Sequence, residues 1–354
     1  MKKLFKTIVI LSLTIIIGFT STEAFAGNKD RAGQAGANEL LVNPWAVSSG
    51  WGNAGMACVK GVSAMWSNVA GISFTNTLEA NFSYTNWLAG SDIKVVSFGL
   101  LVRLSESLVG GLSVMSMNLG EIDRTTVANP DGGIGTYTPS LMNINVAVGK
   151  SFSNSIHGGF VLKIISESIA DMSGTGVALD AGIQYVTGIT DNIHFGIALK
   201  NIGPTMKYSG DGLTFSTLFQ GMTSNITVVQ RADEFELPTQ LNIAAAYDFN
   251  FEQNSRLTLA INFNSNAFSK DQFIGGIEGS FRDILVLRAG YTIEAGAAKN
   301  IESDDCTNVY KGLSLGASVN APLSKKGLKV CIDYSFLNTA HYNGTHSIGA
   351  RILF

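Results

Sequence analysis

The side chains able to perform acid–base or nucleophilic chemistry are few in this sequence, and they are scattered. Nucleophilic catalysis needs a serine, threonine or cysteine beside a base that is itself held in place. No such spacing surrounds any histidine, and for His157 and His194, which are predicted on the lumenal face, a hydrogen-bonding role is expected. We therefore predict that the protein is not an enzyme. The histidines are His157, His194, His341 and His346.

The cysteines and the glycine-rich stretches give no sign of a metal or cofactor. Cys58, Cys306 and Cys331 lack the spacing of a metal site, and their odd number leaves at least one thiol unpaired within the chain, while the sequence leaves open whether any two of them pair. The stretches 129–135 (NPDGGIG) and 209–212 (SGDG) lie in long loops and do not lead from a strand into a helix, as a phosphate-binding loop does. We expect neither a metal nor a cofactor.

The composition favours extended, glycine-rich segments that face something other than water. Charged residues make up 14% of the 354 residues, against roughly 25% in typical soluble proteins. The chain has 39 glycines but only 6 prolines, and its formal net charge is -3 with no basic stripe. A nucleic-acid partner is therefore excluded.

Residues 1–26 have the pattern of a signal peptide. Lys2, Lys3 and Lys6 precede an apolar stretch, and the small-x-small sequence 24–26 (AFA) comes directly before Gly27. The apolar stretch is shorter than the roughly 20 residues of a transmembrane helix. We expect these residues to export the chain and to be removed.

From Leu78 onward the sequence divides into fourteen strand-length segments of alternating polarity. In the segment 175–187, Val177, Leu179 and Ile183 share one face, while Asp180 and Gln184 share the other. The last nine residues, HSIGARILF, alternate in the same way and end on an aromatic residue. The predicted strands are 78–88, 93–104, 108–118, 140–150, 156–166, 175–187, 192–202, 238–249, 255–264, 271–281, 284–295, 310–320, 327–337 and 345–354.

The lengths of the connections distinguish a membrane barrel from a soluble sandwich. Counted from the first strand, every even connection is short, whereas the odd ones include 119–139, 203–237 and 296–309. Short turns at one end and long loops at the other are typical of outer-membrane barrels, whose short turns are periplasmic. The sequence therefore predicts a 14-stranded antiparallel transmembrane β-barrel over 78–354, in contact with the lipid of a Gram-negative outer membrane.

The segment 27–77 does not alternate, and it is rich in glycine and alanine. It also contains apolar residues such as Trp45, Trp51 and Trp66, which suit a solvated periplasmic tail poorly. We expect it to form a plug, or hatch, in the barrel lumen, with a short helix near 56–66.

Part of this segment resembles the hatch signature of FadL-like outer-membrane barrels. In that superfamily a Gly-Met-Gly-Ala-like run leads into an Asn-Pro-Ala-Gly motif, and Val69 stands here where the family has proline. The stretches 200–204 (KNIGP) and 236–247 (ELPTQLNIAAAY) are also similar to family segments. The matching hatch residues are Gly55, Met56, Asn68, Ala70 and Gly71.

Within the superfamily the sequence looks most similar to the PorV/PorQ branch, which includes outer-membrane components of the type IX secretion system. That resemblance implies binding of a secretion-system protein or of exported cargo. The alternative is a FadL-like transporter of long-chain fatty acids or other hydrophobic small molecules, and a structural barrel with neither role also stays open. Apolar residues in the loop 203–237 would contact the partner or ligand, or pack across the barrel mouth: Leu213, Phe215, Leu218, Phe219 and Val228.

The charges predicted on the lumenal face are mixed in sign. A ring of like charges would indicate an ion-selective pore, whereas a mixed set suits a network that pairs each charge and holds a plug. We expect the network rather than an open porin. Its predicted members are Asp180, Lys200, Arg256, Glu278, Arg288, Lys329, Asp333 and Arg351.

Overall fold

The computed structural model describes residues 27–354 except 222, 253, 296–306, 324–326 and 340–341. The predicted signal peptide, Cys306, His341 and most of the loop 296–309 lie outside the described residues. In the part of the chain that is described, no helix is long and apolar enough to span a membrane.

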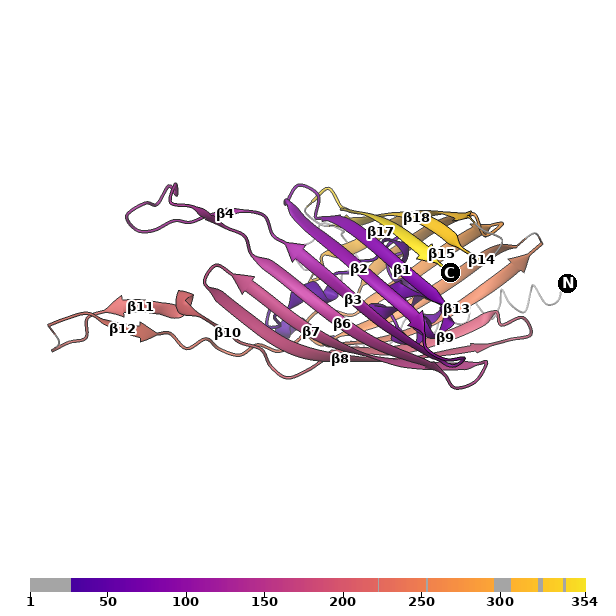
Figure 1. Ribbon diagram of the computed structural model, residues 1–354, viewed down its shortest axis with the longest axis horizontal. Helices are drawn as coiled ribbons and strands as arrows, with labels where there is room; N and C mark the ends of the chain where they lie inside the picture. Colours follow the sequence, from indigo (N-terminus) through magenta and orange to yellow (C-terminus); the bar gives the residue numbers. More distant parts are fainter. Residues whose placement is uncertain (1–26, 222, 253, 296–306, 324–326, 340–341) are drawn as a thin grey trace.

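Fourteen long antiparallel strands form a closed barrel, as the alternation predicts (Figure 1). Each predicted segment corresponds to one of them, with ends displaced by at most a few residues. The strands are β1 (Leu78–Trp87), β2 (Ile93–Arg103), β3 (Leu108–Asn118), β6 (Ser140–Ser151), β7 (Ile156–Ile169), β8 (Met172–Thr187), β9 (Ile193–Ile202), β13 (Gln240–Phe251), β14 (Ser255–Asn266), β15 (Gln272–Phe281), β16 (Leu285–Glu294), β17 (Tyr310–Pro322), β18 (Lys329–Thr339) and β19 (Thr345–Leu353).

Closure of the barrel comes from pairing of the first strand with the last. β1 pairs with β19 from Glu79↔Leu353 to Asn86↔His346, and each remaining strand pairs with the next long strand along the chain. Closure removes the sheet edges, so that the backbone groups of the wall are satisfied within the sheet, as lipid requires. The final alternating stretch of the chain is therefore the closing strand.

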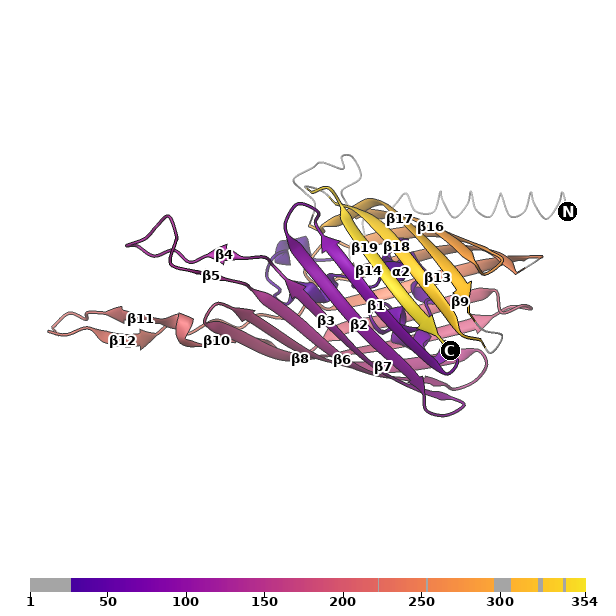
Figure 2. The ribbon, with the colours of Figure 1, turned by 45° about the horizontal axis from the view of Figure 1, so that its top comes forward.

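Within the described residues, the long loops carry five short strands that the alternation does not reveal. Each is only two to four residues long, too short to show a period of two. β4 and β5 pair with each other, β10 adds to the end of β8, and β11 and β12 form a hairpin (Figure 2). They are β4 (Ile122–Asp123), β5 (Thr136–Tyr137), β10 (Tyr208–Ser209), β11 (Thr214–Thr217) and β12 (Ile226–Val229).

The two predicted faces of the wall are present. On β8 the side chains of Leu179 and Ile183 are 53% and 56% exposed on the outside, while Asp180 and Gln184 are buried inside. The outward positions of the other strands are also apolar, and they include Tyr247, Phe249, Tyr291 and Tyr334. The outer surface therefore suits lipid, and aromatic rings at its rims suit the headgroup regions.

The N-terminal segment lies inside the barrel and consists of short turns of helix (Figure 2). The helix predicted near 56–66 is wrong: η3 and η4 are separate 3₁₀ turns. Gly61, between them, has φ +72°, a conformation that a continuous right-handed helix does not allow. The turns are η1 (Lys29–Arg31), η2 (Asn38–Leu41), α2 (Ala46–Ser49), η3 (Ala54–Ala57), η4 (Val62–Met65) and η5 (Val69–Phe74).

The plug approaches the wall most closely where inward positions of the strands are glycines. A Cβ at Gly316 would lie 2.7 Å from the Gly50 Cα, and one at Gly276 would lie 2.6 Å from the Ala54 Cβ. At Gly290 a Cβ would overlap the carbonyl oxygen of Trp51. These glycines therefore let plug backbone and wall backbone touch.

We predict that Gly290→Ala destabilises the plugged barrel by about 1–3 kcal/mol, because the added methyl group overlaps backbone that cannot move aside cheaply. Gly275→Ala is the matched control: it lies on the neighbouring strand β15, and a Cβ there meets nothing within 4 Å. Urea unfolding followed by heat-dependent gel mobility measures both. Equal stability of the two variants would contradict the close packing described here.

Candidate ligand cavity and plug

A cavity of about 640 Å³ lies in the lumen between the plug and the strand ends that lead into the long loops. Plug residues around Glu39, Asn53 and Met56 form one boundary. The volume lies within the range of about 300–1,000 Å³ that is common for small-molecule sites. The space that the plug leaves unfilled is therefore large enough for a ligand.

The two sides of this cavity differ in chemistry. On one side, β3, β6 and β7 contribute the apolar side chains of Met117, Leu141 and Ile169, beside Leu119 and Trp87. The other side is a set of carboxamides on β13, β14 and β15, and its members are Gln240, Asn242, Asn262, Asn264, Asn266 and Gln272. An amphipathic chamber results.

Lys200 also lines the cavity, and its ammonium group lies 3.4 Å from the centroid of the Trp66 ring. Asp180, which the sequence analysis places in the same network, pairs instead with Lys163 at 2.6 Å. The backbone N–H of Asn201 donates to Asp180 at 2.7 Å, at a point where the pairing of β8 with β9 shifts by one residue. The bulge therefore keeps Asp180 satisfied and leaves Lys200 beside the cavity.

Glu39 is a buried acid of the plug, and its side chain is 3% exposed. It faces Glu167 of β7, whose carboxylate accepts a hydrogen bond from the Tyr208 hydroxyl. The Asn143 carboxamide, with its nitrogen toward the plug, donates to Glu39 Oε1 over 3.3 Å. Burial, with Glu167 next in effect, raises the pKa of Glu39 to about 8. Glu39 is therefore largely protonated at neutral pH.

We predict that the plugged barrel loses stability as pH rises from about 4.5 to about 8, because the folded state binds the Glu39 proton more tightly than the unfolded state, where the pKa is near 4.5. The contribution is complete below pH 4.5 and is lost as pH rises through the folded pKa. Glu39→Gln should flatten this slope when urea midpoints are measured from pH 5 to pH 9. Glu106→Gln, an exposed glutamate in a turn, is the control and should keep the wild-type slope. Parallel slopes for all three proteins would contradict the assignment.

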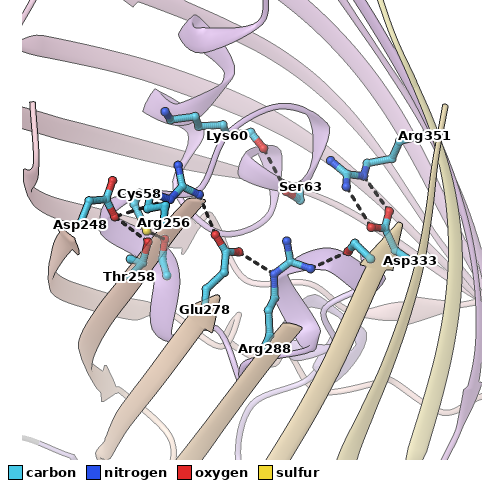
Figure 3. A network of polar contacts seen from close by, with 12 residues as sticks. Cys58, Lys60, Ser63, Asp248, Arg256, Thr258, Glu278, Arg288, Asp333 and Arg351 are labelled. Carbon is cyan, nitrogen blue, oxygen red and sulfur yellow. Dashed lines mark hydrogen bonds and ion pairs between the residues drawn. The ribbon is translucent and has the colours of Figure 1, made fainter. Parts of the chain in front are cut away.

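Nearer the short turns than the cavity, a row of paired charges runs from strand to strand along the inner face of the wall (Figure 3). Asp248 contacts His194 at 3.0 Å and lies 3.9 Å from Arg256. Arg256 then reaches Glu278 at 2.8 Å, and Glu278 accepts from Arg288 at 2.7 Å. This brings together three of the predicted network residues in a continuous path facing the plug. That the path holds the plug in place stays a prediction.

The other predicted charges lie apart from that path. Arg351 makes a bidentate pair with Asp333, with distances of 2.7 and 2.9 Å. Beside it, Glu79 of β1 accepts a hydrogen bond from the backbone N–H of Val62 in the plug, at 3.0 Å. Lys329 takes part in neither group. The lumenal charges therefore form separate clusters rather than one network.

The hatch-like residues contact the wall directly. Asn68 begins η5: its side-chain oxygen accepts from the Ala70 N–H, and its nitrogen donates to the Ile183 carbonyl of β8 at 3.1 Å. Gly71 has no room for a side chain, because a Cβ would overlap the Val59 carbonyl. Gly55 and Met56 lie in η3, and the Met56 carbonyl accepts from Gln184 of β8. The two halves of the motif thus attach to the same strand.

The cysteines within the described residues are free. Cys331 is fully buried on β18, and Cys58 lies in the plug near Arg256 (Figure 3). Burial, with smaller contributions from Glu278 and Asp248, raises the pKa of the Cys58 thiol to about 12. Cys58 is therefore a weak nucleophile at neutral pH.

The apolar loop residues predicted to contact a partner or ligand do not pack across the barrel mouth. Phe215, Leu218 and Phe219 are about half exposed, at 51%, 56% and 50%, on and beside the β11–β12 hairpin. This hairpin extends away from the barrel (Figure 1). Leu213 and Val228 lie on the same projection and are partly buried.

Several cavity residues were missed at the sequence level. The asparagines at 262, 264 and 266 stand at alternate positions in β14, and this spacing could have indicated a polar patch inside the barrel. Glu39 gives no comparable signal, because the plug has no period that assigns its side chains to a face.

No family model matches the sequence, and no curated protein does either. Solved structures do match. The Pseudomonas putida toluene transporter TodX is 13% identical with a TM-score of 0.52, and the match covers 87% of this chain and 96% of that one. The CymD monoaromatic hydrocarbon channel is 13% identical (TM-score 0.53; 88% and 97% covered), and the Ralstonia pickettii toluene transporter TbuX is 11% identical (0.51; 87% and 96%).

The protein therefore shares the fold of these hydrocarbon channels and toluene transporters. At such identities the likeness concerns the fold alone. Nothing in these matches points to the PorV/PorQ branch, so the narrower resemblance drawn from the sequence gains no support from them.

Proposed function

We propose that the protein is an outer-membrane channel for hydrophobic small molecules, in which the cavity receives the ligand and the plug closes the lumen below it. The observation that carries this proposal is the cavity itself, with an apolar wall formed by β3, β6 and β7. The matching hydrocarbon channels and toluene transporters support it through their fold. This is the alternative of the two functions that the sequence suggests.

The plug makes an open water-filled pore a poor alternative. Trp45, Val62 and Ile72 pack against Leu101 and Val161 of the wall in one apolar cluster. Trp51 and Met56 pack against wall alanines in a second. Water-soluble solutes therefore meet a packed obstruction, whereas an apolar ligand can leave water at the cavity.

We predict that expression in a Gram-negative host lacking its own hydrophobic-compound channel increases uptake of radiolabelled toluene or decanoate over an empty vector. Leu141→Trp should reduce that gain several-fold, because the larger ring fills the cavity. Met142→Trp is the matched control, since the adjacent side chain points outward and is 37% exposed. No gain with correctly folded wild-type protein would contradict the proposal.

The same assay can test whether uptake requires movement of the plug. Ala46 of the plug lies 3.4 Å from where a Cβ at Gly349 of β19 would be, close to the Cβ separation of a disulfide. In a background without the native cysteines, the Ala46→Cys/Gly349→Cys pair should block uptake when oxidised and restore it on reduction. Either single variant is the control. Uptake that persists in the oxidised pair would show that the ligand passes without movement of this part of the plug.

Binding of a secretion-system protein or exported cargo is a second proposal, and the hairpin favours it. Exposed aromatic and aliphatic residues on a projection far from the barrel wall have no lipid to contact. We predict that a partner co-purifies in mild detergent from the native membrane, and that Phe215→Ser with Leu218→Ser and Phe219→Ser abolishes its recovery without changing uptake. Repeated isolation of the intact barrel alone would contradict it.

A further inference from the structure

The backbone nitrogen of Gly27, the residue that follows the predicted signal peptide, contacts a buried acid of the wall. Its N–H donates to Asp271 Oδ2 at 2.8 Å. Asp271 directly precedes β15 and is 2% exposed, and its Oδ1 accepts from the backbone N–H of Asn266 at 3.2 Å. A buried carboxylate is stable only when it is paired or well hydrogen-bonded. A positive charge on the Gly27 nitrogen would therefore suit this position.

The space around Gly27 accepts only glycine. A Cβ at this residue would lie 2.6 Å from the backbone nitrogen of Asp271 and 2.8 Å from the carbonyl oxygen of Ser269. Both contacts are overlaps with backbone, which cannot move aside cheaply. Any other residue in this place would therefore push its own nitrogen away from Asp271.

The first residues of the plug, 27–36, run along one boundary of the cavity, and we call them the N-terminal strap. The Arg31 guanidinium lies 4.2 Å from the centroid of the Phe268 ring and pairs with Glu236 at 2.5 Å. Gly36 donates its N–H to the Glu236 carbonyl at 3.0 Å. Both Gly36 and Phe268 line the cavity. An anchor at the first residue of the strap therefore helps to keep this boundary of the cavity in place.

We propose that processing during export completes this anchor: cleavage after Ala26 turns the Gly27 nitrogen into an α-ammonium group, which forms a buried ion pair with Asp271 and fixes the strap. The cleavage is a hydrolysis in which one water is consumed, the released peptide keeps a carboxylate, and the freed amine takes up a proton. A hydrogen bond from an ammonium group to a carboxylate is roughly twice as strong as one between neutral groups. The inference does not depend on which ligand the cavity takes.

The test is chemical modification of the N-terminal α-amine in the mature protein. The full chain is expressed in a Gram-negative host and purified in detergent, and its first residue is identified by mass spectrometry. An α-amine-selective pyridine carboxaldehyde is then added, and modification of the N-terminal peptide is followed over time. We expect the chain to begin at Gly27. We expect the wild-type amine to react slowly, because the reagent reaches it only when the strap opens.

Three variants complete the experiment. Asp271→Asn keeps the shape of the side chain but removes its charge, and it should speed modification at least about tenfold, the effect of losing one hydrogen bond to a charged group. Asp283→Asn changes an exposed aspartate in the turn after β15, and as the matched control it should react like the wild type. A chain with Gly-Ser inserted after Ala26 should also react fast, because its amine lies beyond Asp271.

The possible results separate this inference from the proposed function. A mature chain that begins at a residue other than Gly27 would overturn the inference, and so would equal modification rates for the wild type and Asp271→Asn. If Asp271→Asn lacks the heat-dependent gel mobility of the folded barrel, the chain with the insertion decides, and a rate equal to that of the wild type would overturn the inference. None of these results bears on uptake of a ligand, so the proposed function stands or falls on its own test.

Discussion

The structure depends on contact between the plug and the inside of the wall. Fourteen strands enclose a lumen wider than inward side chains alone can fill, so the N-terminal segment must supply the rest of the core. Its backbone comes closest to the wall where wall side chains are absent, and there Gly276, Gly290 and Gly316 face Ala54, Trp51 and Gly50. The high glycine content therefore reflects close packing inside the barrel as much as strand composition. What the plug leaves unfilled becomes the cavity.

The polar side chains inside the barrel differ between its two ends in whether other protein groups form their hydrogen bonds or ion pairs. Near the short turns, opposite charges neutralise one another, as between Glu278 and its two arginines. At the cavity the wall carries neutral carboxamides, and several of their hydrogen-bonding atoms are uncommitted. In a poorly solvated lumen both arrangements matter, because an unpaired charge costs far more to bury than an unpaired amide.

The sequence predicts the wall well because membrane barrels obey a simple period. Every second residue faces lipid, so β8 and β19 could be assigned with their faces, and loop lengths gave the topology. The plug has no period, and its turns depend on tertiary contacts such as that of Asn68 with β8, so its predicted helix was wrong. The individual charge pairs could not be predicted for a related reason: alternation gives the face of Asp180, but its pairing with Lys163 depends on the neighbouring strand and on the bulge at Asn201.

The same limit explains why the sequence placed partner binding first, whereas the fold comparisons favour the alternative, a channel for hydrophobic compounds. Exposed apolar residues in the loop 203–237 are visible in the sequence and suggest a partner, whereas a cavity is a property of several strands and the plug together. Its apolar side comes from β3, β6 and β7, and its carboxamides come from β13, β14 and β15, much further along the chain. Only closure of β1 on β19 and of β8 on β9 makes the two sides face each other. The chemistry of the cavity is therefore set by the topology of the barrel, and a motif in one segment of the sequence describes at most one side of it.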